Sequence, residues 1–242
     1  MSKALATQAV KLVHDRVKAS VPDFDGRAVL LFSGGRDSSA VAAAFCQAFP
    51  DSQLHLLLID NGLLSRLDST KRQVRLIQGL APQTDVIFEM KRVSMMMREV
   101  GMQKIEGDFI KRGYSTLLVC LACKLIMNYS AARYAKELGI RLVLDGYAER
   151  QKEYPEQTDE FMGPLKKIYA DFGLIYLSPL YDILADKAVV NQMLSELGVY
   201  IPKQEPVCMW SDSFSTAKPE EITRYTAEVL ERIVACTTEL QP

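Results

Sequence analysis

Residues 33–39 have the types and order needed to bind an anion. They read Ser-Gly-Gly-Arg-Asp-Ser-Ser, between an apolar run over 28–32 and a helical pattern over 40–49. A glycine turn from strand to helix gathers backbone N–H groups at the positive end of the helix dipole. Gly34 and Gly35 let a phosphate approach the backbone closely. The hydroxyls of Ser38 and Ser39 can cap the helix and donate to the same anion. Because one helix dipole contributes only about 0.3–1 kcal/mol, several donors must act together.

The cysteines are a second candidate centre. Cys120 and Cys123 are one helical turn apart, so both thiols can lie on the same side of a helix. Cys208 lies in a later connecting segment that can return to the same site. Three thiolates suit an iron–sulfur cluster with one iron left open. A persulfide is an alternative, as are zinc, which prefers four ligands, and plain burial of the thiols in the core.

Strand-like and helix-like stretches alternate along the chain and would position these residues. Strands are expected at 27–33, 54–59, 85–89, 141–144 and 174–177. Helices are expected at 3–19, 40–49, 65–80, 116–138, between 160 and 174, at 182–197 and from Pro219 onward. This alternation predicts an α/β fold with a doubly wound, mostly parallel sheet and a C-terminal helical extension. We expect three parts: an N-terminal helix over 1–26, a nucleotide-binding domain over 27–200, and an extension over 201–242 that carries Cys208.

Asp60 falls at the end of the second expected strand. Ligands of open parallel sheets bind at the carboxyl ends of strands, where the strand order reverses. The Asp60 carboxylate is therefore a candidate contact for ribose or adenine. A structural turn with Asn61 and Gly62 explains the same residues equally well.

Composition and charge restrict the function classes. The 242 residues carry a net charge of −1, which gives no overall attraction to nucleic acid or to an anionic membrane. Residues 66–112 hold ten Lys or Arg against six Asp or Glu, which suits a patch facing a polyanion or an ordinary solvated surface. No stretch is apolar enough to span a membrane, and the N-terminus lacks a secretory core. Five cysteines, an odd number, argue against a disulfide framework. We therefore expect a cytoplasmic protein.

The 33–39 stretch resembles the SGGxDS signature of the PP-loop ATP pyrophosphatases, the adenine nucleotide alpha hydrolase-like group. The Walker pattern is absent, since no Lys precedes the hydroxyl. The resemblance implies cleavage of ATP between the α- and β-phosphates. It further implies that pyrophosphate is held by Ser33, Gly34, Gly35, Ser38 and Ser39, and that Mg²⁺ is placed by Asp37.

Residues 27–232 resemble two kinds of PP-loop enzyme. Cys120-x-x-Cys123-Lys124 with Cys208 is similar to the cluster-bearing sulfur transferases of tRNA thiolation and of nickel-pincer cofactor assembly. The segments 203–208 and 220–222 resemble the nickel-pincer type in particular. Other segments resemble 7-cyano-7-deazaguanine synthase, namely Asp145-Gly146, Glu153-Tyr154-Pro155, Glu160-Phe161 and Ser178-Pro179-Leu180 with Lys187. The four-cysteine zinc cluster of that synthase has no counterpart here except Cys208.

These resemblances imply an ATP-dependent sulfur transferase that adenylates a carbonyl-type oxygen and then replaces it with sulfur. Cys120, Cys123 and Cys208 would hold a [4Fe-4S] cluster or carry a persulfide. Gly146 and Lys187 would lie at the nucleotide, although Lys187 could equally be a solvated helix residue. One alternative is an amide- or nitrile-forming ligase that uses ammonia, and another is a nucleotide-binding module without catalysis.

The expected partners are a small nucleobase-like substrate and a sulfur donor, sulfide or persulfide. A tRNA substrate and a homodimer are open alternatives. Tyr147, Glu153, Tyr154 and Trp210 are candidates for lining the acceptor pocket, and each is equally suited to ordinary packing.

Overall fold

A computed structural model describes residues 3–65, 67–111, 118–151, 154–184, 186–201, 207–208 and 217–239. The strands are β1 (Arg27–Leu31), β2 (Gln53–Asp60), β3 (Leu64–Ser65), β4 (Asp85–Arg92), β5 (Leu142–Leu144), β6 (Ile175–Leu177) and β7 (Val207–Cys208). The helices are α1 (Ala4–Ser20), α2 (Arg36–Ala48), α3 (Leu67–Leu80), α4 (Ser94–Met96), α5 (Ile105–Lys111), α6 (Val119–Glu137), α7 (Asp159–Asp171), α8 (Lys187–Leu197) and α9 (Pro219–Glu239). Short helical turns lie at Met97–Gly101, Met102–Lys104, Glu149–Gln151 and Pro155–Gln157.

Five strands form an all-parallel sheet in the order β4-β2-β1-β5-β6. Leu30 of β1 lies between Leu56 of β2 and Leu144 of β5, which fixes the register at the centre of the sheet. The chain builds outward from β1 in one direction and then in the other, so the order reverses between β1 and β5. The loop that follows β1 therefore lies at the switch point, where ligands of such sheets bind.

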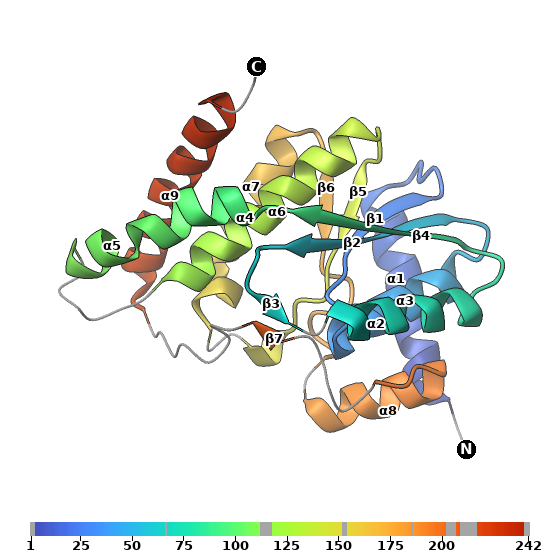
Figure 1. The fold of residues 1–242 in the computed structure, drawn as a ribbon. Helices are drawn as coiled ribbons and strands as arrows, with labels where there is room; N and C mark the ends of the chain where they lie inside the picture. The colour runs from blue at the N-terminus through green and yellow to red at the C-terminus, as the bar shows by residue number, and fades with distance from the viewer. Residues whose placement is uncertain are drawn as a thin grey trace.

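Helices cover both faces of the sheet (Figure 1). On one face, α1, α2, α3 and α8 pack against Ala28 and Leu30 of β1. On the other face, α6, α7 and α9 pack against Val29 of β1 and Val143 of β5. Alternate residues of one strand thus enter two separate cores, because successive side chains of a strand point to opposite faces. The α/β fold with a doubly wound parallel sheet is confirmed.

Several element boundaries differ from expectation. Helix α2 begins at Arg36, before the expected Ala40, and its N-cap is Gly35. The prediction that Ser38 or Ser39 caps this helix is therefore wrong. Helix α8 begins at Lys187 rather than at 182, because the Asp186 carboxylate caps it by accepting from Val189 N at 2.8 Å. Strand β4 continues to Arg92, pairing with the whole length of β2.

The expected division into three parts stays a prediction. Helix α1 shares the core of α2 and α8 through Ala9, Val13 and Val17. Helix α9 contributes Tyr225 and Val229 to the opposite core. Of the helices in the described ranges, none combines the length and the apolar composition that crossing a bilayer requires.

Gly146 follows β5 and lies against the first turn of α2. A Cβ added to Gly146 would lie 2.6 Å from Ser38 N and 2.8 Å from the carbonyl carbon of Asp37. These neighbours are backbone atoms of a helix, so they have little freedom to move aside. The absence of a side chain at Gly146 therefore sets how closely the segment after β5 approaches the loop after β1.

We expect Gly146→Ala to lower the free energy of unfolding by about 1–3 kcal/mol, the usual cost of overpacking. The matched control is Gly79→Ala in α3, where an added Cβ meets nothing within 4 Å. That control should gain up to about 1 kcal/mol from its higher helix propensity. Urea unfolding curves measure both, and equal midpoints for Gly146→Ala and the wild type would contradict the prediction.

Candidate functional site

The glycine loop after β1 is anchored to α3. Gly34 has φ +79°, which an L side chain rarely adopts, and a Cβ there would lie 2.8 Å from the Cα of Thr70. The Thr70 hydroxyl donates to the carbonyl of Ser33 at 2.8 Å. Helix α3 therefore anchors the loop, and the N-cap of α2, Gly35, has no side chain.

The serines of the loop have different environments. Ser33 Oγ accepts from Gly35 N at 3.2 Å and lies 3.2 Å from Ser38 Oγ, which donates to the carbonyl of Gly35 at 3.3 Å. Ser39 is fully buried, and within the described residues its hydroxyl has no hydrogen-bond partner. A buried hydroxyl without a partner is costly, and a bound oxyanion would satisfy it. The loop residues thus fit a phosphate-type ligand.

The Asp37 carboxylate beside this loop is already paired with a cation. Arg150 Nη2 donates to both of its oxygens, at 2.7 and 2.6 Å, and Arg150 Nη1 donates to the carbonyl of Leu184 at 2.8 Å. The Asp37 and Arg150 side chains are only 17% and 15% exposed. Carboxylate oxygens are the ligands that Mg²⁺ prefers, so Asp37 suits the ion, but a guanidinium occupies it in this structure. Sequence reasoning missed Arg150.

Asp60 takes part in a structural turn with Gly62, which is the second of its two expected roles. Its Oδ1 accepts from Gly62 N at 2.9 Å, and its Oδ2 lies 3.4 Å from Arg92 Nε. The side chain is buried. The next residue, Asn61, accepts from Leu63 N at 2.8 Å through Oδ1 and donates to Cys123 Sγ at 3.1 Å through Nδ2. This turn therefore joins the end of β2 to the cysteines of α6.

Cys123 and Cys208 both lie near this turn. Cys208 in β7 pairs with Leu64 of β3, close after Asn61 in the chain, and Figure 1 shows this small ribbon beyond the end of β2. Cys120 and Cys208 both act electrostatically on Cys123. We name Cys120, Cys123, Cys208 and Asn61 the cysteine corner.

Burial is the largest influence on Cys123. It raises the pKa of the Cys123 thiol to about 11, against the opposing effects of the Asn61 amide and Lys124. The thiol is also placed to donate to Met127 Sδ at 3.8 Å. Cys123 is thus protonated at neutral pH.

Metal ligation by the cysteine corner does not fit the present geometry. Across the described ranges, no three Cys, His, Asp or Glu side chains are grouped so that they could hold a metal ion. In this structure the Cys123 sulfur contacts the Asn61 amide and Met127 Sδ. No reaction step is therefore derived through an iron–sulfur cluster.

A buried polar network lies behind the cysteine corner. Asn128 accepts from Tyr169 OH at 2.7 Å and donates to the carbonyl of Lys124 at 2.8 Å. Asp145 accepts from Tyr147 N and from Tyr176 OH. Burial raises the pKa of Asp145, although these hydrogen bonds and Lys124 oppose the shift.

Lys124 joins this network through its charge. Its ammonium lies 5.2 Å from the centre of the Tyr147 ring. Burial alone would lower the pKa of Lys124, but Tyr147, Glu156, Cys123 and Asp145 outweigh burial and raise it. Lys124 therefore stays a cation beside Cys123.

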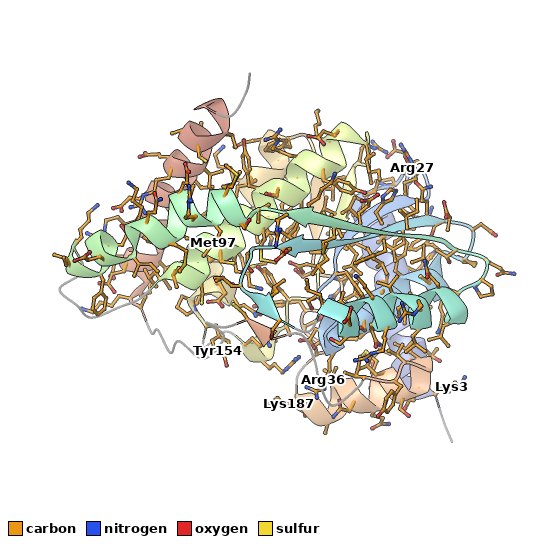
Figure 2. The ribbon with its side chains drawn as sticks, viewed as in Figure 1. Lys3, Arg27, Arg36, Met97, Tyr154 and Lys187 are labelled. Atoms are coloured by element: carbon orange, nitrogen blue, oxygen red, sulfur yellow. The ribbon has the colours of Figure 1, made fainter. Side chains whose placement is uncertain are left out.

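The other expected site residues are dispersed. Lys187 is exposed at the start of α8, and Figure 2 shows it at the same end of the molecule as Arg36. Gly146 contacts the α2 backbone, as described above. Tyr147 is buried in the polar network and Tyr154 is exposed. Glu153 and Trp210 lie outside the described residues.

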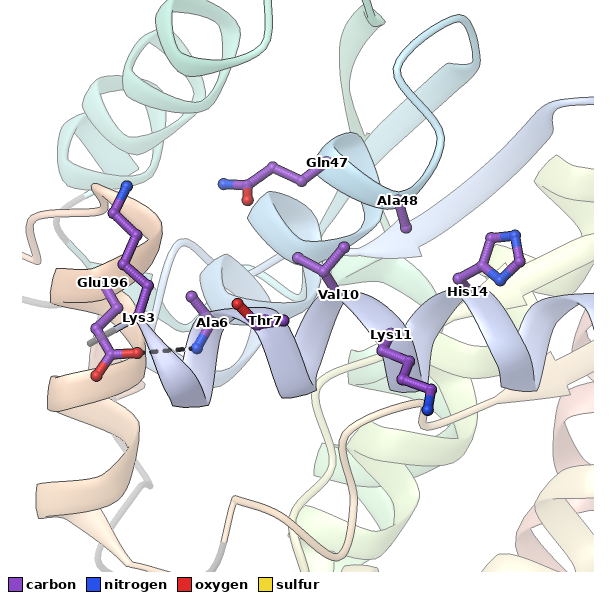
Figure 3. A pocket seen from close by; sticks show the side chains of 9 residues that line it. All are labelled: Lys3, Ala6, Thr7, Val10, Lys11, His14, Gln47, Ala48 and Glu196. Carbon is purple, nitrogen blue, oxygen red and sulfur yellow. Dashed lines mark hydrogen bonds between the residues drawn. The ribbon is translucent and has the colours of Figure 1, made fainter.

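A cavity of about 480 Å³ lies on α1, away from the loop (Figure 3). Its lining includes Lys3, Lys11 and His14 of α1 with Gln47 and Ala48 at the end of α2. At 1.5 Å per residue, Gln47 is about 16 Å along α2 from the glycine loop. This cavity is therefore no part of the candidate site.

The strand order, with a glycine loop at the switch point, defines an α/β protein with a doubly wound parallel sheet. No protein-family model matches the sequence, and no curated protein matches it either. Solved structures do match. One is the U34-tRNA thiolase NcsA from Methanococcus maripaludis with its [4Fe-4S] cluster, with a TM-score of 0.59 and 13% identity over 100% of this chain and 82% of that chain.

A second solved structure is the NMN synthetase from Francisella tularensis, with a TM-score of 0.50 and 16% identity. That match covers 99% of this chain and 94% of the other. At these identities the likeness establishes the fold alone.

We expect the alkylation rate of Cys123 by iodoacetamide, measured in a Cys120→Ser background, to rise with pH up to about pH 11. At pH 8 a shift from 9.0 to about 11 leaves about 100-fold less thiolate than in the unfolded chain. Asn61→Asp keeps the acceptor for Leu63 N but replaces the donor to sulfur with an anion, so the rise should move to higher pH. Mass spectrometry of the modified peptide gives the rates, and alkylation in guanidinium provides the control. A rate that levels off near pH 9.0 would contradict the assignment.

Proposed function

We propose that this chain is an ATP-dependent PP-loop enzyme that adenylates a carbonyl-type oxygen, releases pyrophosphate, and then replaces that oxygen with sulfur. One observation carries the proposal. The glycine loop follows β1, the Asn61 turn follows β2, and these strands are neighbours in the sheet. An anion site and a cysteine corner therefore open at the same edge of the molecule.

In this proposal the loop from Ser33 to Ser39 holds the β- and γ-phosphates. Its support is the Gly34 conformation, the cap without a side chain at Gly35, and the unsatisfied Ser39 hydroxyl. The substrate oxygen attacks the α-phosphorus, and pyrophosphate leaves. Backbone donors and the helix dipole stabilise the charge that develops on the leaving group. Mg²⁺ bound at Asp37 would supply further positive charge there.

The sulfur step is assigned to the cysteine corner. A persulfide on one cysteine attacks the activated carbon, and AMP leaves. A second cysteine of the corner then attacks the Sγ of the cysteine that carried the persulfide. A disulfide forms between the two cysteines, the bond from Sγ to the transferred sulfur breaks, and the thiolated product leaves. The electrostatic effect of Cys120 and Cys208 on Cys123 supports assigning the two roles to these cysteines. External sulfide would reload the site by attacking this disulfide, which leaves a persulfide on one cysteine and a thiol on the other.

We propose a small nucleobase-like acceptor. The matched thiolase is described as acting on U34 of tRNA, and a tRNA acceptor is the alternative for this chain. The basic residues of 66–112 give that alternative limited support, since Arg92 lies against Asp60 and Lys111 against Glu228. A homodimer in the cytoplasm belongs to the same proposal.

A second candidate retains adenylation but uses ammonia as the nucleophile and forms an amide or a nitrile. The protonated state of Cys123 favours it, because a thiol with a pKa of about 11 is a poor nucleophile at neutral pH. Iron, sulfide and persulfide analysis of protein purified without oxygen separates the two candidates. Bound sulfur that is transferred to product supports the first, and product nitrogen derived from labelled ammonia supports the second.

We expect Gly34→Ala to abolish ATP binding, because its φ of +79° and the contact with Thr70 both exclude a side chain. Gly26→Ala is the matched control, since Gly26 has φ +82° but an added Cβ there meets only Ser52 at 4.0 Å. Isothermal titration with a non-hydrolysable ATP analogue measures both variants. Equal affinity of Gly34→Ala and Gly26→Ala would contradict the nucleotide site.

We expect Cys123→Ala to lose thiolated product while keeping ATP binding, because Cys123 contacts Asn61 rather than the glycine loop. Cys46→Ala should keep both, since Cys46 is buried in the other core. Titration and mass spectrometry of the product test this pair. Full thiolation by Cys123→Ala would refute the role given to the cysteine corner.

A further inference from the structure

Asp37 creates an electrostatic problem for the proposed nucleotide site. It is the second residue of α2, at the end of the helix whose positive dipole and N–H groups would bind phosphate. A carboxylate in that position repels a phosphate oxygen unless a cation compensates it. The structure already contains that cation, in the guanidinium of Arg150.

Arg150 is held against Asp37 by several independent contacts. Gly146 lies on the backbone of Asp37 and Ser38, Glu149 N donates to the carbonyl of Tyr181 at 2.9 Å, and Gln151 N donates to the carbonyl of Ala148 at 3.0 Å. Arg150 itself also reaches the Leu184 carbonyl. The backbone of 146–151 thus brings the guanidinium to the mouth of the glycine loop before any ligand arrives.

The chemistry of the pair permits an exchange of partners. The guanidinium is always charged and binds a carboxylate or a phosphate equally well through its planar fork. The carboxylate is in turn a good ligand for Mg²⁺. When Mg²⁺ takes Asp37, the released guanidinium lies beside a phosphate, and no charge is left buried without a partner.

We propose that Arg150 is a phosphate-binding residue of the nucleotide site. In the nucleotide-free protein the Arg150 guanidinium is paired with Asp37, and Mg²⁺ releases the guanidinium by binding the Asp37 carboxylate. This inference rests on the proposed function, because it requires that the glycine loop bind phosphate. Mg²⁺ would then have two effects. It would bind the phosphate, and it would release a second cation, the Arg150 guanidinium, toward the same phosphate.

The test is a titration of pyrophosphate without metal into Asp37→Asn, Arg150→Gln and the double variant. Asp37→Asn removes the anion and frees Arg150, so it should bind metal-free pyrophosphate about tenfold or more tightly than the wild type. The double variant should lose this gain. Asp37→Asn should also lose most of the tightening that Mg²⁺ gives the wild type.

The matched control is the pair Arg232 and Asp108, joined by two hydrogen bonds of 2.7 Å between α9 and α5. Asp108→Asn should leave metal-free pyrophosphate binding unchanged. If the double variant binds as tightly as Asp37→Asn, the role of Arg150 is overturned while the nucleotide site stands. If the wild type with Mg²⁺ binds no pyrophosphate, the proposed function itself fails.

A crystal structure of the wild type with Mg²⁺ and pyrophosphate gives a second test that does not depend on the folding of any variant. We expect the Arg150 guanidinium within hydrogen-bond distance of a phosphate oxygen and Asp37 on the metal. Arg150 still paired with Asp37 and without phosphate contact would overturn the inference.

Discussion

The candidate site depends on the contact between Gly146 and the first turn of α2. Strands β1 and β5 are neighbours across the point where the strand order reverses, so the segments that follow them leave the sheet side by side. Gly146 has no Cβ, and the two backbones can therefore touch. This approach brings Arg150 within reach of Asp37. A side chain at Gly146 would separate the loop from the cation that compensates its carboxylate.

Three carboxylates lie at or just beyond the ends of three adjacent strands, and each is compensated differently. Asp60 accepts from Gly62 N and lies near Arg92. Asp145 accepts a tyrosine hydroxyl and a backbone N–H, and burial raises its pKa. Both are tied into turns and networks that a ligand would have to break. Among the described residues Asp37 is held by the side chain of Arg150, which can exchange a carboxylate for a phosphate without a change of charge. Of these three, it is the carboxylate best suited to respond to a ligand.

The sequence predicted the sheet because its strands are continuous apolar runs, such as 54–59, that alternate with helical periodicity. It misplaced the start of α2, because Ser38 and Ser39 are typical N-cap residues. The N-cap is instead Gly35, which has no side chain. The Asn61 contact with Cys123 was missed, since an Asn before Gly reads as a turn residue. Arg150 lies in a charged stretch without periodicity and reaches Asp37 across 113 positions of the chain. No local pattern encodes such a distant pair.

Two groups that the proposed chemistry needs as free anions have no uncompensated charge in the nucleotide-free protein. A guanidinium neutralises Asp37, and a proton neutralises Cys123, because burial raises the pKa of that thiol from 9.0 to about 11. The folded chain binds this proton more tightly than the unfolded chain. The contribution of the protonated Cys123 thiol to the free energy of unfolding is therefore complete below pH 9.0 and is lost as the pH rises through about 11. The guanidinium on Asp37 and the proton on Cys123 thus favour the folded site. The free energy needed to expose each anion is then part of the step that uses that anion. Binding of Mg²⁺ can offset this free energy at Asp37, and binding of a sulfur donor can offset it at Cys123. Activation of the site is thereby linked to the binding of its reactants.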